Sequence, residues 1–315
     1  MIIRNQQKSF TLIELLVVTV IIGILAGVIM ISTSSSIDKA NIAKSKVFEE
    51  SIQNNLAVNM VSSWSANNVT KSGTSWTLVD EWGNGINGAF YNADSTVCAE
   101  GTACPQIVSD NQMGNVLLFD GIDDSIRTGS ISSFPRGDKD VTYSAYINVH
   151  SHTDNYYDII IGWPWTDETA LCVSAENKMS FDMYGQNGTR YSYRTLSTVS
   201  LNKWYYFVAS YNSADDSINL YIDGKLDRRY ETITSPPRIA GYSAFYIGTG
   251  AAGAYVGSHA FDGLIGEMKV YDGVLTSTQI KQNYIADLDS LLSKGDISKE
   301  DYNQRINAIA YNEHE

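Results

Sequence analysis

The apolar positions at the start of the chain follow two successive patterns. Residues 15–37 contain no charged side chain, and at about 1.5 Å per residue a helix of this length is long enough to cross a hydrocarbon core of about 30 Å. In residues 38–57 the polarity rises, while apolar side chains still recur at helical spacing. These apolar positions are Val47, Phe48, Ile52 and Leu56. The pattern predicts a long helix over 10–57, of which about 12–36 is transmembrane.

After residue 57 the pattern changes to short apolar or alternating runs separated by Gly, Asn, Asp and Ser, which is typical of an antiparallel β-sandwich or jelly roll. The alternating run 218–222 is followed by Asp223-Gly224, which is a strong hairpin signal. Helical periodicity returns near the C-terminus around a Gly295 turn, with Ser298 as an N-cap. The sequence thus predicts a mainly β fold with a long N-terminal α-helix, a sandwich over 58–285 and a short helical hairpin over 286–315.

The composition fits an exported β-rich protein and argues against a nucleic-acid partner. The 315 residues include 20 tyrosines, 6 tryptophans and 24 glycines, while only 18% are charged. Aromatic residues favour strands, and glycines favour tight turns. Phosphate backbones require a concentrated basic surface, whereas the formal net charge of this chain is -13. We therefore expect no nucleic-acid partner.

The three cysteines fit an extracytoplasmic location without requiring it. Cys98 and Cys104 are close together in a loop of Gly, Thr, Ala and Pro residues, so we predict a small disulfide between them. Cys172 is left over and is expected to be buried. A zinc site is disfavoured, because the histidines form no zinc-type spacing with these cysteines.

Residues 8–18, Lys-Ser-Phe-Thr-Leu-Ile-Glu-Leu-Leu-Val-Val, carry the most specific motif in the chain. They resemble the prepilin signal of type IV pilins and type II secretion pseudopilins, in which a short basic leader precedes a Phe-Thr-Leu-x-Glu sequence. The resemblance implies a leader over 1–9, cut by prepilin peptidase between Ser9 and Phe10, and methylation of the new N-terminal Phe10. The family usually has Gly before the cut, so Ser9 is a departure at the processing site.

Glu14 is a carboxylate inside an apolar helix, and burying it in a membrane is costly without a partner. The resemblance implies that Glu14 pairs with the N-terminal ammonium of a neighbouring subunit, which neutralises both charges and sets the axial register of a filament. The alternative is a glutamate that reaches the membrane interface in a plain anchor. Phe10 and Glu14 are therefore the candidate assembly residues.

Six segments match, in order, a laminin-G-like (concanavalin A-like) jelly roll between about residues 59 and 284. These segments are 80–88, 116–124, 141–147, 203–211, 218–225 and 261–271. Such domains bind sugars or proteins, often with calcium, and some relatives hydrolyse polysaccharides, so the fold does not select one activity. The laminarinase-like relatives place paired carboxylates on a Glu-x-Asp-x-x-Glu strand, which this sequence lacks. We therefore expect no enzymatic activity.

Calcium is the cofactor for which the sequence offers candidate ligands. Asp120, Asp123, Asp124 and Asp262 lie in turn-rich segments of the jelly roll. Calcium prefers clustered carboxylate and carbonyl oxygens on loops. Aspartate is also common in turns that hold no metal, because its side chain caps them. Both interpretations are open on the sequence alone.

An aromatic and polar segment is the candidate ligand-binding surface. Asp154, Asn155, Tyr157, Trp163 and Trp165 would place rings against sugar faces, with amide and carboxylate groups on the hydroxyls. Tryptophans of a sandwich are more often part of the core. The segment is a hypothesis that depends on which way these side chains point.

These observations predict a minor pilin or pseudopilin of a type IV pilus or type II secretion-like filament that displays a jelly roll for carbohydrate or protein binding. Its expected partners are other pilin or pseudopilin subunits, prepilin peptidase, the inner membrane and a glycan or surface protein. The expected location is the cytoplasmic membrane, crossed once, and then an extracytoplasmic or cell-surface filament. The alternatives are a membrane-tethered lectin-like or glycoside-hydrolase-like protein that does not polymerise, and a pseudopilin whose jelly roll binds an exported substrate.

Overall fold

The computed structural model describes residues 12–13, 15–22, 59–92, 98, 104–128, 137, 139–152, 157–163, 169–239, 244–249 and 259–310. The chain divides into two compact units, Met1–Phe48 and Glu49–Glu315. Six of the candidate site residues lie outside the described residues. They are Ser9, Phe10, Glu14, Asp154, Asn155 and Trp165.

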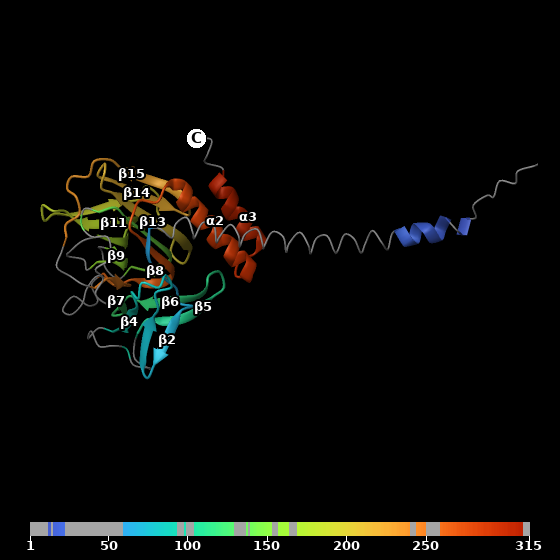
Figure 1. Ribbon diagram of the computed structural model, residues 1–315, viewed down its shortest axis with the longest axis horizontal. Coiled ribbons are helices and arrows are strands. Elements are labelled where there is room, and N and C mark those ends of the chain that lie inside the picture. Colours follow the sequence, from blue (N-terminus) through green and yellow to red (C-terminus); the bar gives the residue numbers. More distant parts are fainter. Residues whose placement is uncertain are drawn as a thin grey trace, which may run out of the picture. The chain divides into compact units, whose positions relative to one another are not determined.

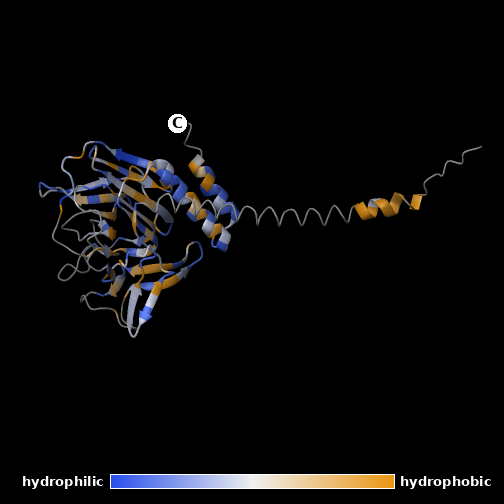
Figure 2. Ribbon diagram, in the orientation of Figure 1, coloured by the Kyte–Doolittle hydropathy of each residue, from blue (hydrophilic) through white to orange (hydrophobic). Residues whose placement is uncertain are grey.

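In the first unit, residues 12–13 and 15–22 are helical, and this helix is hydrophobic (Figure 2). Its large hydrophobic side chains are exposed. The hydroxyl of Thr19 donates a hydrogen bond to the carbonyl of Leu16 (2.9 Å) within this helix. Among the described residues, no helix has both the length and the apolar character needed to cross a membrane. Most of the predicted span, 12–36, lies outside them.

The second unit is a sandwich of two antiparallel sheets, called sheet A and sheet B (Figure 1). Sheet A has 8 strands in the order β15-β14-β13-β8-β17-β6-β5, with β1 also paired to β17. Its strands are β1 (Met60–Trp64), β5 (Gln106–Asp110), β6 (Gly114–Asp120), β8 (Val141–Ser151), β13 (Trp204–Asn212), β14 (Ser217–Ile222), β15 (Lys225–Tyr230) and β17 (Asp262–Tyr271).

Sheet B has 9 strands in the order β12-β11-β10-β9-β16-β7-β4-β3-β2. Its strands are β2 (Val69–Ser72), β3 (Ser75–Leu78), β4 (Gly88–Tyr91), β7 (Ser125–Thr128), β9 (Tyr157–Gly162), β10 (Thr169–Ser174), β11 (Met179–Tyr184), β12 (Arg190–Arg194) and β16 (Tyr246–Ile247). Consecutive strands alternate between the sheets at several points, as in a jelly roll. The predicted mainly β architecture is confirmed.

The main core lies between the two sheets and is rich in aromatic side chains. Trp64 stacks on Phe245 with ring centroids 6.2 Å apart, and Tyr143 lies 5.8 Å from the same ring. Phe119 and Phe261 meet edge to face at 6.4 Å. Because each such side chain buries roughly 150–250 Å², these rings contribute a large part of the core between the sheets.

Two helices, α2 (Ser277–Lys294) and α3 (Lys299–Ala310), cover the outer face of sheet A (Figure 1). A second apolar cluster forms there, and it includes Tyr146, Tyr206, Tyr271 and Tyr284. The central strands of sheet A are therefore buried on both faces. This explains why almost every residue of β8 is buried, whereas a strand with one wet face would alternate.

The start of the C-terminal helical segment differs from the predicted boundary after residue 285. Helix α2 begins at Ser277 because Thr276 and Gln279 form a capping box: the Thr276 hydroxyl accepts from the Gln279 N–H, and the Gln279 side chain accepts from the Thr276 N–H. The predicted turn is present, since Gly295 adopts φ 82° as the C-cap of α2. Ser298 caps α3 by accepting the Asp301 N–H (3.1 Å).

Cys98 and Cys104 are joined by a disulfide, which is the pairing that the sequence predicts. Cys98 follows β4 of sheet B, and Cys104 precedes β5 of sheet A. The bond therefore lies where the chain passes from one sheet to the other. Cys172 is free and buried, and burial raises the pKa of its thiol well above the usual value.

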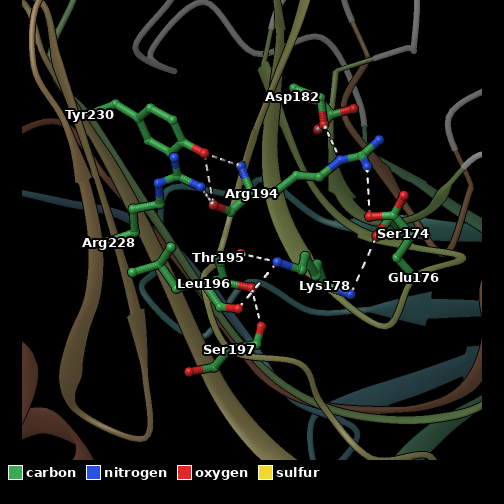
Figure 3. Close-up of polar contacts among 11 residues, drawn as sticks. Ser174, Glu176, Lys178, Asp182, Arg194, Thr195, Leu196, Ser197, Arg228 and Tyr230 are labelled. Carbon is green, nitrogen blue, oxygen red and sulfur yellow. Dashed lines mark hydrogen bonds and ion pairs between the residues drawn. The ribbon is translucent and has the colours of Figure 1, made fainter.

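Strand β12, at the end of sheet B, is tied to β15 of sheet A by polar contacts (Figure 3). The hydroxyl of Tyr230 accepts the Arg194 N–H (3.0 Å) and donates to the Arg194 carbonyl (2.8 Å). The carboxylate of Asp227 accepts the N–H groups of Leu196 (2.5 Å) and Ser197 (3.1 Å). An edge strand with unpaired backbone groups invites pairing with another chain, and these contacts occupy part of that edge.

Candidate functional site

The loop from β6 to β7 gathers three carboxylates at one rim of the sandwich. Asp120 ends β6, and its Oδ1 accepts the N–H groups of Ile122 (2.8 Å) and Asp123 (3.4 Å). Gly121 has φ 72°, a conformation that glycine adopts without steric cost. The Asp120 N–H donates to Asp124 Oδ2 (3.0 Å). This tight loop brings one carboxylate oxygen from each of the three aspartates within 4.8 Å of one another.

The electrostatics of this acidic loop, Asp120, Asp123 and Asp124, disfavour three negative charges. Asp124 is 3% exposed, and burial, reinforced by the charges of Asp120 and Asp123, raises its pKa to about 7. Oδ1 of Asp123 and Oδ1 of Asp124 are buried and accept no hydrogen bond from the described part of the chain. Buried carboxylate oxygens without donors are costly, and a bound cation would satisfy them.

The residues of the acidic loop fit calcium, which takes carboxylate and carbonyl oxygens from loops in a flexible geometry. Asp262, the fourth predicted ligand, does not join the three. It lies opposite Asp120 in the β17–β6 register, but its Oδ2 accepts a hydrogen bond from Ser151 (2.5 Å) and its Oδ1 is 3.9 Å from His150 Nδ1. The backbone register places Asp120 and Asp262 opposite each other, but the Asp262 carboxylate contacts Ser151 and His150 and is not part of the acidic loop.

The structure describes two residues of the candidate ligand-binding surface, Tyr157 and Trp163, and for both the predicted role is wrong. Trp163 is 1% exposed and packs edge-on against Phe245 in the core, with centroids 5.7 Å apart. Tyr157 is 9% exposed, and its ring lies against His259 (4.6 Å) and the Arg190 guanidinium (3.5 Å). Neither ring offers a free face to a sugar. The alternating pattern of a single strand could not predict which of its faces is buried, because that depends on the register with the neighbouring strands.

The structure reveals a partly buried ion pair on the outer face of sheet B that the sequence analysis missed. Arg190 Nη2 donates to Asp182 Oδ2 (2.6 Å), and the Ser192 hydroxyl donates to Asp182 Oδ1 (2.8 Å). Burial raises the pKa of Asp182 to about 6. Burial and the charge of Arg194 lower the pKa of Arg190 to about 10. The alternating sequence Arg-Tyr-Ser-Tyr-Arg, residues 190–194, was the available signal, because it places both arginines on one face of β12.

A groove of ≈ 940 Å³ lies between the β14–β15 hairpin and the two helices. Its lining combines the basic side chains Lys203, Lys225 and Lys281 with apolar Leu226 and acidic Asp223. The Asp223 carboxylate accepts the Tyr206 N–H (2.8 Å), and burial raises its pKa. The sequence analysis treated Asp223-Gly224 only as a hairpin turn, since nothing in the sequence places helices α2 and α3 beside that turn.

Comparisons with known proteins identify two regions of the chain. Residues 120–281 match the model of the concanavalin A-like lectin/glucanases superfamily. Residues 4–30 match the prokaryotic N-terminal methylation motif. A comparison with curated protein sequences gives no match. Both resemblances that the sequence suggested are thereby confirmed.

Solved structures resemble the sandwich at low sequence identity. The binding domain of Paraclostridial Mosquitocidal Protein 1 matches with a TM-score of 0.55 and 15% identity, over 74% of this chain and 53% of that one. The ligand-binding domain of botulinum neurotoxin serotype D, solved with N-acetylneuraminic acid, matches with 0.53 and 14%, over 75% and 53%. This chain thus spans about half of those two chains.

Domain 4 of the arabinanase AbnA from Geobacillus stearothermophilus, solved with arabinotriose, matches with a TM-score of 0.50 and 16% identity, over 70% of this chain and 96% of that domain. At these identities the likenesses establish the fold alone.

Proposed function

Because this chain belongs to the concanavalin A-like lectin/glucanases superfamily and carries a prokaryotic N-terminal methylation motif, we propose that it is a minor pilin or pseudopilin that displays a binding jelly roll on a filament. The observation that supports this proposal is the presence of both regions in one chain. The motif supplies an assembly signal, and the sandwich supplies a surface for a carbohydrate or protein. A domain of this size is difficult to pack at every filament position, so the subunit is a minor one.

Assembly follows from the N-terminal motif. Prepilin peptidase cuts between Ser9 and Phe10 and methylates Phe10, and the apolar helix remains in the mature protein. Glu14 then pairs with the N-terminal ammonium of a neighbouring subunit, which removes the cost of a lone carboxylate in an apolar environment. The protein passes from the cytoplasmic membrane into a filament at the cell surface.

Binding of a glycan or surface protein is the proposed role of the jelly roll. Two structures of the same fold hold N-acetylneuraminic acid and arabinotriose, respectively, which supports a carbohydrate as the first ligand class to test. Calcium held by Asp120, Asp123 and Asp124 would fix the loop that connects the two sheets and offer open coordination positions to hydroxyl or carboxylate oxygens. The proposal includes binding without hydrolysis.

A second function, a tethered lectin-like or hydrolase-like protein that never polymerises, is favoured by one observation. Ser9 stands where the resembled family usually has Gly, at the residue before the cut. Poor processing would leave the leader in place and the N-terminal amine away from Glu14. The two functions therefore differ in the chemistry of the N-terminus.

Mass analysis of the protein from membrane and sheared-filament fractions tests the assembly proposal. We expect the N-terminal peptide to begin at Phe10 and to carry one methyl group. Recovery of the protein from the membrane fraction alone, with Met1 retained, would refute filament assembly and favour the tethered alternative. The binding proposal is tested separately, by comparing filament recovery and glycan binding between a Glu14 variant and an Asp124 variant.

A further inference from the structure

Lys269 of β17 lies beneath helix α2, between two carboxylates. Its Nζ is 2.7 Å from Glu267 Oε2 on the same strand and 3.5 Å from Asp287 Oδ1 on α2. The other oxygen of Asp287, Oδ2, accepts a hydrogen bond from the Tyr146 hydroxyl (3.0 Å). One amine, two carboxylic groups and one hydroxyl donor therefore meet where the helix packs on sheet A.

The side chains of this group have limited access to solvent. The side chains of Lys269, Asp287 and Glu267 are 12%, 19% and 31% exposed, respectively, and Tyr146 and Tyr206 are buried. Burial by itself lowers the pKa of Lys269, but the charges of Asp287 and Glu267 outweigh burial and hold the pKa well above its usual range. The resting state is thus an ammonium beside two carboxylates. Amide formation must therefore begin with a proton transfer from this ammonium to a carboxylate, a step that the raised pKa opposes and that the poor solvation of separated charges at this site favours.

We propose that Lys269 and Asp287 form an intramolecular isopeptide bond, with Glu267 as the catalytic proton carrier. The inference is independent of the proposed function, because it concerns a covalent modification within the sandwich unit. The three residues also divide the roles that amide formation requires. Lys269 is the nucleophile, Asp287 is the electrophile, and Glu267 moves a proton between them.

The reaction balances without any external reagent. Transfer of one proton from the Lys269 ammonium to Asp287 Oδ1 gives a neutral amine and a carboxylic acid. The Nζ lone pair attacks Cγ, and the negative charge that develops on Oδ2 is stabilised by the Tyr146 hydroxyl. Glu267 accepts a proton from the attacking nitrogen and delivers it to the Oδ1 hydroxyl, which leaves as water. The products are a secondary amide and one water molecule.

Proximity of the two groups accounts for most of the expected rate of bond formation. An amine and a carboxylic acid fixed side by side react with an effective concentration on the order of 10⁵ M or more, whereas the same groups in dilute solution do not condense. The closing bond would connect the strand that pairs with β1, β6 and β8 to helix α2. It would hold α2 on sheet A after the tyrosine contacts of the apolar cluster had broken.

Intact-mass analysis of the purified full-length protein tests the proposal. We expect the wild-type mass to be lower by one water than the mass calculated for the linear chain, after correction for N-terminal processing and the disulfide. Tandem mass spectrometry should locate the loss in a branched peptide that joins residues 269 and 287. A wild-type mass without the water loss, or a branch between other residues, would overturn the proposal.

Variants assign the roles. Lys269→Arg and Asp287→Ala should each remove the water loss, and Tyr146→Phe should slow its appearance. Glu267→Gln should slow bond formation about 100-fold, so that the bonded fraction of newly synthesised protein falls sharply. Glu300→Gln, an exposed glutamate on α3, is the matched control and should form the bond like wild type. Undiminished bonding in Glu267→Gln would refute the assignment of Glu267 as proton carrier.

Discussion

At the scale of single residues, Asp124 shows how a tight loop changes the chemistry of a common side chain. It is buried beside two other aspartates, and one of its oxygens has no hydrogen-bond donor in the described part of the chain. These conditions raise its pKa to about 7. The same conditions favour a cation, since a divalent ion would replace the proton and satisfy both unpaired oxygens of the loop.

The pH dependence of stability follows from this shift. Without metal, the folded protein keeps a proton on Asp124 between about pH 4 and pH 7, where the unfolded chain has lost it, so the free energy of unfolding falls as pH rises through this window. Calcium must displace that proton, so it should raise the melting temperature clearly at about pH 8 and little at about pH 5. Thermal denaturation of the full-length chain with calcium or a chelator measures both effects.

Asp124→Asn should remove the calcium-dependent shift in melting temperature. Without metal, the free energy of unfolding of this variant should no longer fall between about pH 4 and pH 7, because the titrating group is gone. Asp272→Asn, which changes an exposed aspartate on the loop after β17, is the control and should behave like wild type. If calcium stabilises Asp124→Asn as much as wild type, the acidic loop does not hold the metal.

At the scale of elements, helix α2 shows that a local signal can decide where a helix begins. The capping box satisfies backbone donors at its start, and Tyr284 and Leu288 bury its inner face against sheet A. Burial alone would not select Ser277 as the first helical residue. The cap does, because the backbone N–H groups of the first turn otherwise lack partners.

Thr276→Ala should lower the free energy of unfolding by about 1 kcal/mol, the usual cost of losing an N-cap side chain. Thr278→Ala is the matched control, since Thr278 is exposed inside the first turn and alanine favours helix there. Denaturant-induced unfolding of both variants gives the comparison. Equal losses in the two variants would show that the capping box does not stabilise α2.

At the scale of the whole molecule, two compact units carry two separable functions in the proposal. Glu14 belongs to the N-terminal unit and Asp124 to the sandwich unit. Glu14→Ala should abolish recovery of the protein in sheared filaments and leave glycan binding by the detergent-solubilised chain unchanged. Asp124→Asn should abolish glycan binding and leave recovery of the protein in sheared filaments unchanged. Immunoblots of filament fractions and a glycan array, with and without calcium, measure the two outcomes.

The array experiment also separates the remaining alternatives. Bound glycans should stay intact on prolonged incubation, and their hydrolysis would refute the proposal of binding without catalysis. An array without any bound glycan, together with loss of secretion when the protein is deleted, would favour a pseudopilin that recognises an exported protein. Recovery of Glu14→Ala in filaments at the wild-type level would remove the assembly role of Glu14.

The sequence by itself determined the features that depend on local or contiguous information. The prepilin-type motif, the alternating strand segments, the Asp223-Gly224 hairpin and the nearby Cys98–Cys104 pair can all be recognised in short windows. In each case the physical cause, whether recognition by a peptidase, a period of two or a tight turn, acts over a few neighbouring residues. The acidic loop belongs to the same class, because Asp120, Asp123 and Asp124 lie within one turn.

Only the tertiary structure decided which face of a strand is buried and which distant side chains meet. Trp163 is in the core because sheet A covers that side of the chain, and Asp262 is engaged by Ser151 because β17 and β8 are neighbours. Lys269 and Asp287 approach because α2 packs on the outer face of sheet A. Strand register and helix docking are set by the packing of the whole sandwich, and a single strand pattern carries no information about its partners.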